Sequence, residues 1–318
     1  MGEEIPGVEE DTRWRKAIPE ARDRLQSRVL VAMAGGWLLI ESLSALWVMY
    51  ETPDKESDFV RLDVEIVVAS VVFALIVLGL RAATPVAAAF GGMICLILLW
   101  GTASPHYGVM RSSLAPLILL FVLTFVSTRA GHRIKAKTGS AEKRTGRNAA
   151  QVTANLAVAA LSVANLGTFL LGGVGSYSGN YYGRWVGPAM IMMCLAALVE
   201  ATADTVSSEI GQAFGGDPVL LVGLRRVAPG TDGAVTVVGS CAGIAAGGVV
   251  ALGGAWAMHL SAGAILTALG AGVCGFFFDS LLGATVERRG WLGNDLVNFS
   301  STLFAAVLAA VVYRFFVL

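Results

Sequence analysis

Acidic and hydroxyl side chains at helical spacing stand at the end of one long apolar run. Glu200, Asp204 and Ser208 recur every fourth residue, which places them on one helical face, and Glu209 follows directly. A carboxylate near the centre of a bilayer costs about 2.5–3.5 kcal/mol and usually marks a functional site. The pattern therefore predicts a site here. The alternative is that Asp204 and Glu209 only solvate a helix end.

A second polar cluster surrounds the loop between the last two apolar runs. Asp279 precedes this loop, and Asn294, Asp295 and Asn298 follow it at the start of the final run. Asn294, Asn298 and Ser301 form a stripe that enters the bilayer. These groups could bind a ligand, or they could serve as hydrogen-bonding contacts between helices.

A glycine-containing turn lies between the two clusters. Arg225 and Arg226 precede it, and Gly230, Thr231 and Asp232 belong to it. A glycine turn that enters a helix offers free N–H groups and the positive end of the helix dipole to an anion. The pattern is compatible with phosphate binding, although other loops that enter a helix look similar.

A basic loop precedes the fifth apolar run. It carries three cations that could hold phosphate, Lys143, Arg144 and Arg147. The following run begins with three amides on one helical face, Asn148, Gln151 and Asn155. The alternative is that this loop meets only anionic lipid headgroups.

The elements that position these residues must be membrane helices. The chain has 318 residues, of which 55% are apolar and 14% charged, against about 45–50% and 25% in soluble domains. About 20 apolar residues span a bilayer, and backbone groups in lipid must bond within their own helix. We therefore predict an all-α, polytopic transmembrane helical bundle. Its nine expected spans are about 29–50, 64–80, 84–100, 112–128, 150–173, 185–204, 234–255, 260–284 and 296–317.

The basic residues predict the orientation of the bundle. With the N-terminus in the cytoplasm, 18 of the 23 Lys and Arg residues lie inside and five outside, as the positive-inside rule requires. The two polar clusters, the glycine turn and the basic loop then face the cytoplasm, at the inner membrane if the chain is bacterial. Residues 1–28 form a polar N-terminal segment, either an interfacial amphipathic helix or a disordered tail, and the role of Glu41 stays open.

Composition also bears on partners. The net charge is zero, so nucleic acid is not an expected partner, and no phosphate-binding P-loop motif occurs. The organisation that we predict is a set of N-terminal helices over 29–128 and a catalytic region over 129–318. The catalytic region has cytoplasmic loops at 129–149, 205–233 and 285–295.

Five motifs in order carry a resemblance. They read Q-V-T-A-N, A-D-T-V-S-S-E-I-G, P-G-T-D-G-A-V-T-V-V-G, D-S-L-L-G-A-T and N-D-L-V-N-F-S-S-T. Together they resemble the transmembrane protein nineteen family, which includes the plastid phytyl-phosphate kinase. The resemblance covers roughly residues 129–316, whereas the first four spans match only in being apolar. One departure is Ala234, where the family often has a second glycine.

The resemblance implies a kinase that converts an isoprenoid monophosphate into the diphosphate, using Mg²⁺ and CTP rather than ATP. The motif positions are Asp204, Ser208, Glu209, Thr231, Asp232, Asp279, Asn294, Asp295 and Asn298. Asp204, Asp279 and Asp295 would be catalytic. With Glu209 they are candidate Mg²⁺ ligands, because magnesium prefers carboxylates together with phosphate oxygens.

The remaining candidates would bind nucleotide or substrate. The cations Lys143, Arg144, Arg147, Arg225 and Arg226 would hold phosphates, and the amides Asn148, Asn155, Asn294 and Asn298 would orient them or contact the base. Gln151, Ser208, Gly230, Thr231 and Asp232 complete this set. The alternatives are a prenyl-alcohol kinase, a lipid-phosphate or anion transporter, and a structural membrane scaffold. Isoprenoid length and oligomeric state stay open.

Overall fold

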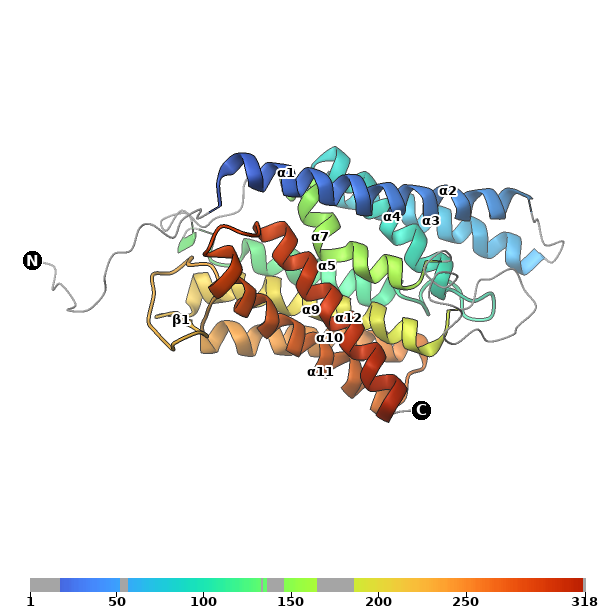
Figure 1. Cartoon of the computed structure of the whole chain (residues 1–318). Coiled ribbons are helices and arrows are strands. Elements are labelled where there is room, and N and C mark those ends of the chain that lie inside the picture. Colours follow the sequence, from blue (N-terminus) through green and yellow to red (C-terminus); the bar gives the residue numbers. More distant parts are fainter. Residues whose placement is uncertain (1–17, 52–56, 133, 136–145, 165–185, 317–318) are drawn as a thin grey trace, which may run out of the picture.

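The fold consists almost entirely of helices that run along a common direction (Figure 1). The structure is a computed structural model that describes residues 18–51, 57–132, 134–135, 146–164 and 186–316. Its elements are α1 (Glu20–Leu30), η2 (Val31–Gly35), α2 (Gly36–Glu51), α3 (Ser57–Gly79), α4 (Pro85–Thr102), α5 (Leu114–Arg129), α7 (Ala149–Ser162), α9 (Pro188–Phe214), β1 (Val219–Leu220), β2 (Ala234–Val235), α10 (Val237–Met258), α11 (Ala262–Leu282), η3 (Gly283–Glu287) and α12 (Asn294–Phe316).

Seven of the described helical segments are long and apolar enough to cross a membrane. They are the continuous α1–η2–α2, then α3, α4, α9, α10, the continuous α11–η3, and α12. The predicted spans 112–128 and 150–173 correspond to the shorter apolar helices α5 and α7, and residues 165–173 lie outside the described part. The predicted all-α membrane class is confirmed, and the predicted number of nine spans is approximate.

Side-chain caps fix where several helices begin. The Thr84 hydroxyl accepts a hydrogen bond from the Ala87 N–H, and Pro85 occupies the first helical turn of α4. In α10 the Thr236 hydroxyl accepts from the Gly239 N–H at 3.0 Å. Thr231 and Asp232 of the preceding glycine turn lie upstream of this cap. Pairing of β2 with β1 keeps the chain extended through Val235, so the helix starts later.

Helix α9 occupies the middle of the bundle and packs against α5, α7, α10, α11 and α12. Small residues let α10 approach it closely. A Cβ added at Gly243 would lie 2.4 Å from the Ala203 carbonyl oxygen, and one at Gly239 would lie 2.5 Å from that of Ser207. The Gly239, Gly243 and Gly247 repeat therefore serves helix packing, as such small-residue repeats commonly do in membranes.

The polar chain segments gather at one end of the bundle. Figure 1 shows the start of α1, the β1 loop and the start of α12 at this end, and the last turns of α12 at the opposite end. We call it the basic end, because Arg81, Arg129, Arg147 and Arg288 lie in its turns. It is the end that the distribution of basic residues predicts to be cytoplasmic.

The first helix begins earlier than its apolar run. It continues without a break from Glu20 to Glu51 through the π-helical turn η2. Residues 20–28 of the polar N-terminal segment are thus helical, and residues 1–17 lie outside the described part. The Arg22 guanidinium donates to the Gly290 carbonyl at 3.1 Å. The Gln26 amide donates to the Trp291 carbonyl at 2.8 Å. This contact ties the first helix to the turn before α12.

Candidate functional site

A polar cavity of about 210 Å³ lies at the basic end, between α9, α11, α12 and the loop 215–236. It brings together eight of the residues that the sequence singled out: Asp204, Ser208, Gly230, Thr231, Asp232, Asp279, Asn294 and Asn298. The two acidic clusters and the glycine turn, which are distant in sequence, therefore form one site. We call it the polar cavity.

Contacts between α11 and α12 position the Asp279 carboxylate. The buried Ser301 hydroxyl donates to Asp279 Oδ2 at 3.0 Å. One turn earlier on α12, the Asn298 amide donates to Asn155 Oδ1 of α7 at 3.1 Å. Asn298 and Ser301 therefore serve as hydrogen-bonding contacts between helices, and Asn298 also lines the cavity.

Arg147 lies close enough to Asp204 to interact with it electrostatically. Its backbone is held by the turn between α3 and α4: the Arg147 N–H donates to the Ala82 carbonyl at 2.9 Å, and its carbonyl accepts from the Thr84 N–H at 3.0 Å. Its guanidinium donates to the Thr205 hydroxyl of α9 at 3.4 Å. A fixed cation therefore stands beside a cavity carboxylate.

Two further carboxylates, those of Glu287 and Glu200, lie at or near the cavity. Glu287, at the end of η3, lines the cavity. It lies eight residues after Asp279, the same spacing that separates Glu200 from Ser208. If the helix is assumed to continue past the apolar run, this spacing places Glu287 on the face of Asp279 and could have identified it. Glu200 is 1% exposed and lies near Asp204 and Asp279. Its Oε1 has no hydrogen-bond partner among the described residues.

Acidic side chains accumulate around this cavity. Four carboxylates line it, those of Asp204, Asp232, Asp279 and Glu287. Burial raises the pKa of Asp232 above its ordinary value, and the nearby Arg288 opposes this rise. Like charges in a partly buried site repel one another strongly. A cation bound among them would relieve that repulsion.

The donor set fits a metal shared with a ligand better than a metal held by protein alone. Among the described residues, no group of three or more His, Cys, Asp or Glu side chains converges closely enough to hold an ion. Mg²⁺ is commonly bound by one or two carboxylates, with phosphate oxygens and waters completing the shell. Asp204 and Asp279 match that pattern, and the unpartnered Glu200 oxygen beside them is compatible with it.

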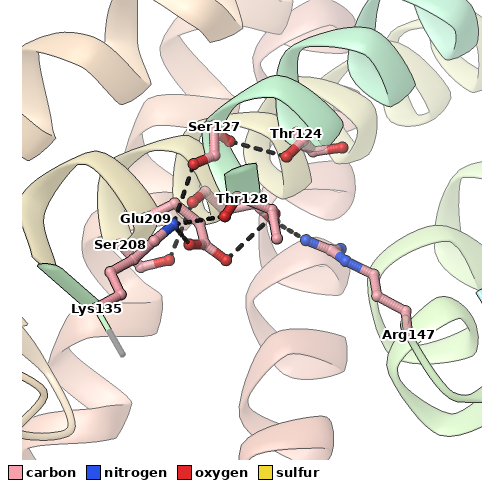
Figure 2. A network of polar contacts seen from close by, with 8 residues as sticks. Thr124, Ser127, Thr128, Lys135, Arg147, Ser208 and Glu209 are labelled. Carbon is pink, nitrogen blue, oxygen red and sulfur yellow. Dashed lines mark hydrogen bonds and ion pairs between the residues drawn. The ribbon is translucent and has the colours of Figure 1, made fainter. Parts of the chain in front are cut away.

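Glu209, a predicted metal ligand, does not line the polar cavity. Its carboxylate forms an ion pair with the buried Lys135 ammonium and accepts from the Thr128 hydroxyl at 3.2 Å (Figure 2). Lys135 also donates to the Ser127 and Thr128 carbonyls, at 3.2 and 2.7 Å. These carbonyls belong to the last turn of α5, where backbone partners become scarce, and that of Ser127 also accepts from the Ala130 N–H at 3.1 Å. Glu209 therefore holds Lys135 at a helix end.

Asp295, also predicted to be catalytic, is likewise absent from the cavity lining. Its Oδ2 accepts from the Ser27 hydroxyl of α1 at 2.6 Å, so the carboxylate joins the first helix to the last. No sequence pattern indicates this partner, because the two residues are 268 positions apart.

The other predicted phosphate-binding residues lie elsewhere. Arg225 is exposed, and Arg226 forms an exposed pair with Asp217 at 3.4 Å. Asn148 and Gln151 form a capping box in which each side chain accepts from the other residue's backbone N–H, so they start α7. Lys143 and Arg144 lie outside the described residues.

Gly233 places the glycine turn against η3. Its φ is +71°, and an added Cβ would lie 2.0 Å from the Ala284 nitrogen. Gly216 has nearly the same φ, +70°, but nothing lies within 4 Å of an added Cβ. We expect Gly216→Ala to lose only the roughly 1–2 kcal/mol that a left-handed non-glycine residue costs. Gly233→Ala should lose about 1–3 kcal/mol more through the backbone clash.

Thermal unfolding of the two purified variants checks this difference. Equal melting temperatures for Gly216→Ala and Gly233→Ala would mean that the turn does not pack on η3.

The arrangement has the parts of a phosphate-handling site: carboxylates, amides, a fixed arginine and a glycine turn around one cavity. A model of the family described as integral membrane protein DUF92 matches residues 68–306. The match begins within α3 and includes α4 and α5, whereas the resemblance in the motifs began only near residue 129. No solved structure matches the chain.

Individual relatives are similar over shorter stretches. The uncharacterized membrane protein sll0875 of Synechocystis is 32% identical over 63% of this chain and 72% of its own length. The uncharacterized membrane protein MJ0933 of Methanocaldococcus jannaschii is 33% identical over 37% of this chain and 50% of its own. The chloroplastic protein VTE6 of Arabidopsis thaliana is 26% identical over 61% of this chain and 56% of its own. Since the family model covers most of the chain, this protein belongs to the integral membrane protein DUF92 family.

Proposed function

We propose that this protein is a Mg²⁺-dependent kinase that transfers a phosphoryl group from a nucleotide, CTP rather than ATP, to an isoprenoid monophosphate. The observation that carries the proposal is the convergence of Asp204, Asp279 and Asn298, from three different helices, on one cavity at the basic end. The similarity to the chloroplastic VTE6 protein supports it, as does the motif resemblance to a family that includes the plastid phytyl-phosphate kinase.

The charges around the polar cavity favour a nucleotide bound together with a cation. A triphosphate alone would be repelled by the four carboxylates of the lining, whereas Mg²⁺ shared between carboxylates and phosphate oxygens neutralises both. Asp204 and Asp279 would hold the ion, and its charge would stabilise the negative charge on the transferred group. The glycine turn at Gly230 and Thr231 would approach the phosphates.

The acceptor needs little activation by the protein. A phosphate monoester has a second pKa of about 6, so near pH 7 it is largely a dianion. One of its oxygens forms a bond to the γ-phosphorus, the bond from that phosphorus to the β–γ bridging oxygen breaks, and the nucleoside diphosphate leaves with the electron pair. No proton has to be removed. The chain's own task is to position the groups and balance their charge.

The direct test mixes the purified protein with Mg²⁺, labelled CTP or ATP, and farnesyl or phytyl monophosphate. We expect labelled prenyl diphosphate, formed faster from CTP than from ATP. A prenyl-alcohol kinase would instead phosphorylate farnesol or phytol and leave the monophosphates unchanged.

A transporter is tested in sealed vesicles. Movement of a lipid phosphate across the membrane without nucleotide consumption would contradict the kinase proposal. In the orientation we propose, with the N-terminus in the cytoplasm, added nucleotide reaches the polar cavity only from the side that carries the basic end.

A further inference from the structure

A second, larger cavity lies beside the polar one and has a different character. Its volume is about 460 Å³, within the roughly 300–1,000 Å³ typical of ligand sites. Residues of α3, α4, α5, α7 and α9 line it, most of them apolar. The rings of Phe73 and Phe121 meet edge to face at 5.7 Å and link α3 to α5 across it. We call it the apolar cavity.

The mouth of the apolar cavity is cationic. Arg81, Arg129, His132 and Arg147 all line it, and none of the described residues in the lining is acidic. These side chains belong to the turns of the basic end. The two cavities are therefore complementary in charge: the polar one carries four carboxylates, whereas the apolar one has a basic rim.

The two cavities share a wall that is one pair of side chains thick. Asn155 lines the apolar cavity, Asn298 lines the polar cavity, and their amides are hydrogen-bonded at 3.1 Å. Arg147 also stands at this boundary, because it lines the apolar cavity and lies near Asp204 of the polar one. A group held by Arg147 would be next to the carboxylates.

We propose that the apolar cavity binds the hydrocarbon chain of a single-chain lipid phosphomonoester, with its phosphate held by Arg147 at the boundary with the polar cavity. This inference rests on the proposed function for the identity of the acceptor. It assigns the acceptor to the α3–α4–α5 side and the nucleotide to the α9–α11–α12 side. Arg147 is then a positioning residue that places the acceptor phosphate against the nucleotide, and Asn155 aligns the wall between them.

Charge and shape argue for this occupant. A chain buried among apolar side chains leaves water, which favours binding in proportion to its buried surface. Its phosphate would meet guanidinium groups, which form strong charge-assisted hydrogen bonds with phosphate oxygens. An uncharged lipid would leave the basic mouth unused, and a soluble phosphate would leave the apolar lining unused.

The chain-binding part is tested by filling the cavity. Gly91 lines it, and an added Cβ there would make only an ordinary contact, 3.7 Å from Phe73. Gly91→Leu should therefore fold and project its side chain into the cavity. We expect binding of labelled farnesyl monophosphate to the full-length protein in nanodiscs to weaken about 10-fold or more. Gly270→Leu on α11, where no atom lies within 4 Å, is the matched control and should bind as the wild type does.

The phosphate-binding part is tested with Arg147→Gln. Binding of farnesyl monophosphate should fall about 10- to 100-fold, because a charge-assisted contact is lost. Binding of farnesol, which has no phosphate, should stay unchanged. Arg289→Gln, outside the lining of both cavities, is the control and should leave both affinities unchanged.

Two results separate this inference from the proposed function. The lipid site stands and the kinase proposal fails if farnesyl monophosphate binds the wild type, binds Gly91→Leu more weakly, and is never phosphorylated. If Gly91→Leu and Arg147→Gln bind the probe as the wild type does, the lipid site is wrong, even if the wild type is a kinase. Equal competition by a two-chain phosphatidic acid would also overturn it, since a bilayer phospholipid would then be the occupant.

Discussion

We expect Asp204→Asn and Asp279→Asn each to lower the rate of the proposed phosphoryl transfer at least roughly 100-fold, the scale seen when one preorganised electrostatic contact to a transition state is removed. Each change keeps the size of the side chain and removes the negative charge that would hold Mg²⁺ in the polar cavity. The measurement is diphosphate formation from labelled CTP and a prenyl monophosphate by the purified variants.

Both variants should still insert and fold. Removing one buried carboxylate from a cluster of like charges relieves repulsion, so thermal unfolding should occur near or above the wild-type temperature. Asp217→Asn is the matched control, since the Asp217 side chain is 77% exposed, pairs with the exposed Arg226, and lies outside the cavity lining. It should retain full activity. Near-normal turnover in both cavity variants would show that the polar cavity is not the catalytic site.

The second large effect concerns stability. Lys135→Met leaves the Glu209 carboxylate without its ion-pair partner and removes the bonds that satisfy the last turn of α5. The Lys135 side chain is 0% exposed and that of Glu209 is 16% exposed. Loss of one partner of a buried pair typically costs about 3–5 kcal/mol. We expect the variant in detergent to have a markedly lower melting temperature than the wild type. Tryptophan fluorescence during heating measures this temperature.

The double variant Lys135→Met/Glu209→Leu separates a structural role of Glu209 from a metal-binding one. Replacing both charges by apolar groups of similar size is often neutral, so stability should return toward the wild type. Activity should return with it, because Glu209 lies outside the polar cavity. A double variant that is stable but inactive would restore Glu209 as a candidate metal ligand.

Residues on one regular helix could be placed from the sequence. Asp204 and Ser208 share a face because four residues make about one helical turn, and both line the cavity. The cost of carboxylates in lipid singled out Asp204, which the structure places in the cavity lining. These arguments use only local geometry and solvation, so they need no knowledge of neighbouring helices.

Residues whose partners lie far along the chain could not be placed in the same way. Glu209 pairs with Lys135, 74 positions away, and Asp295 accepts from Ser27, 268 positions away. Both carboxylates match the expected motif, yet each is turned from the cavity by a partner that periodicity does not reveal. Asn148 was expected to bind a ligand, but it caps α7. The reason is local, since an amide just before a helix can cap that helix as readily as it can bind a ligand.

The contact between the first helix and the turn before the last one bears on how the protein is assembled in the membrane. Gln26 bonds both to the Trp291 carbonyl and to the Gly293 N–H, each at 2.8 Å. Ribosomal synthesis produces α1 first, and its partners emerge only after some 265 further residues. Until then the polar face of α1 has no native counterpart, so closure of the basic end is a late event of biogenesis. Premature termination before residue 290 would leave the polar face of α1 without these partners and exposed to quality-control proteases.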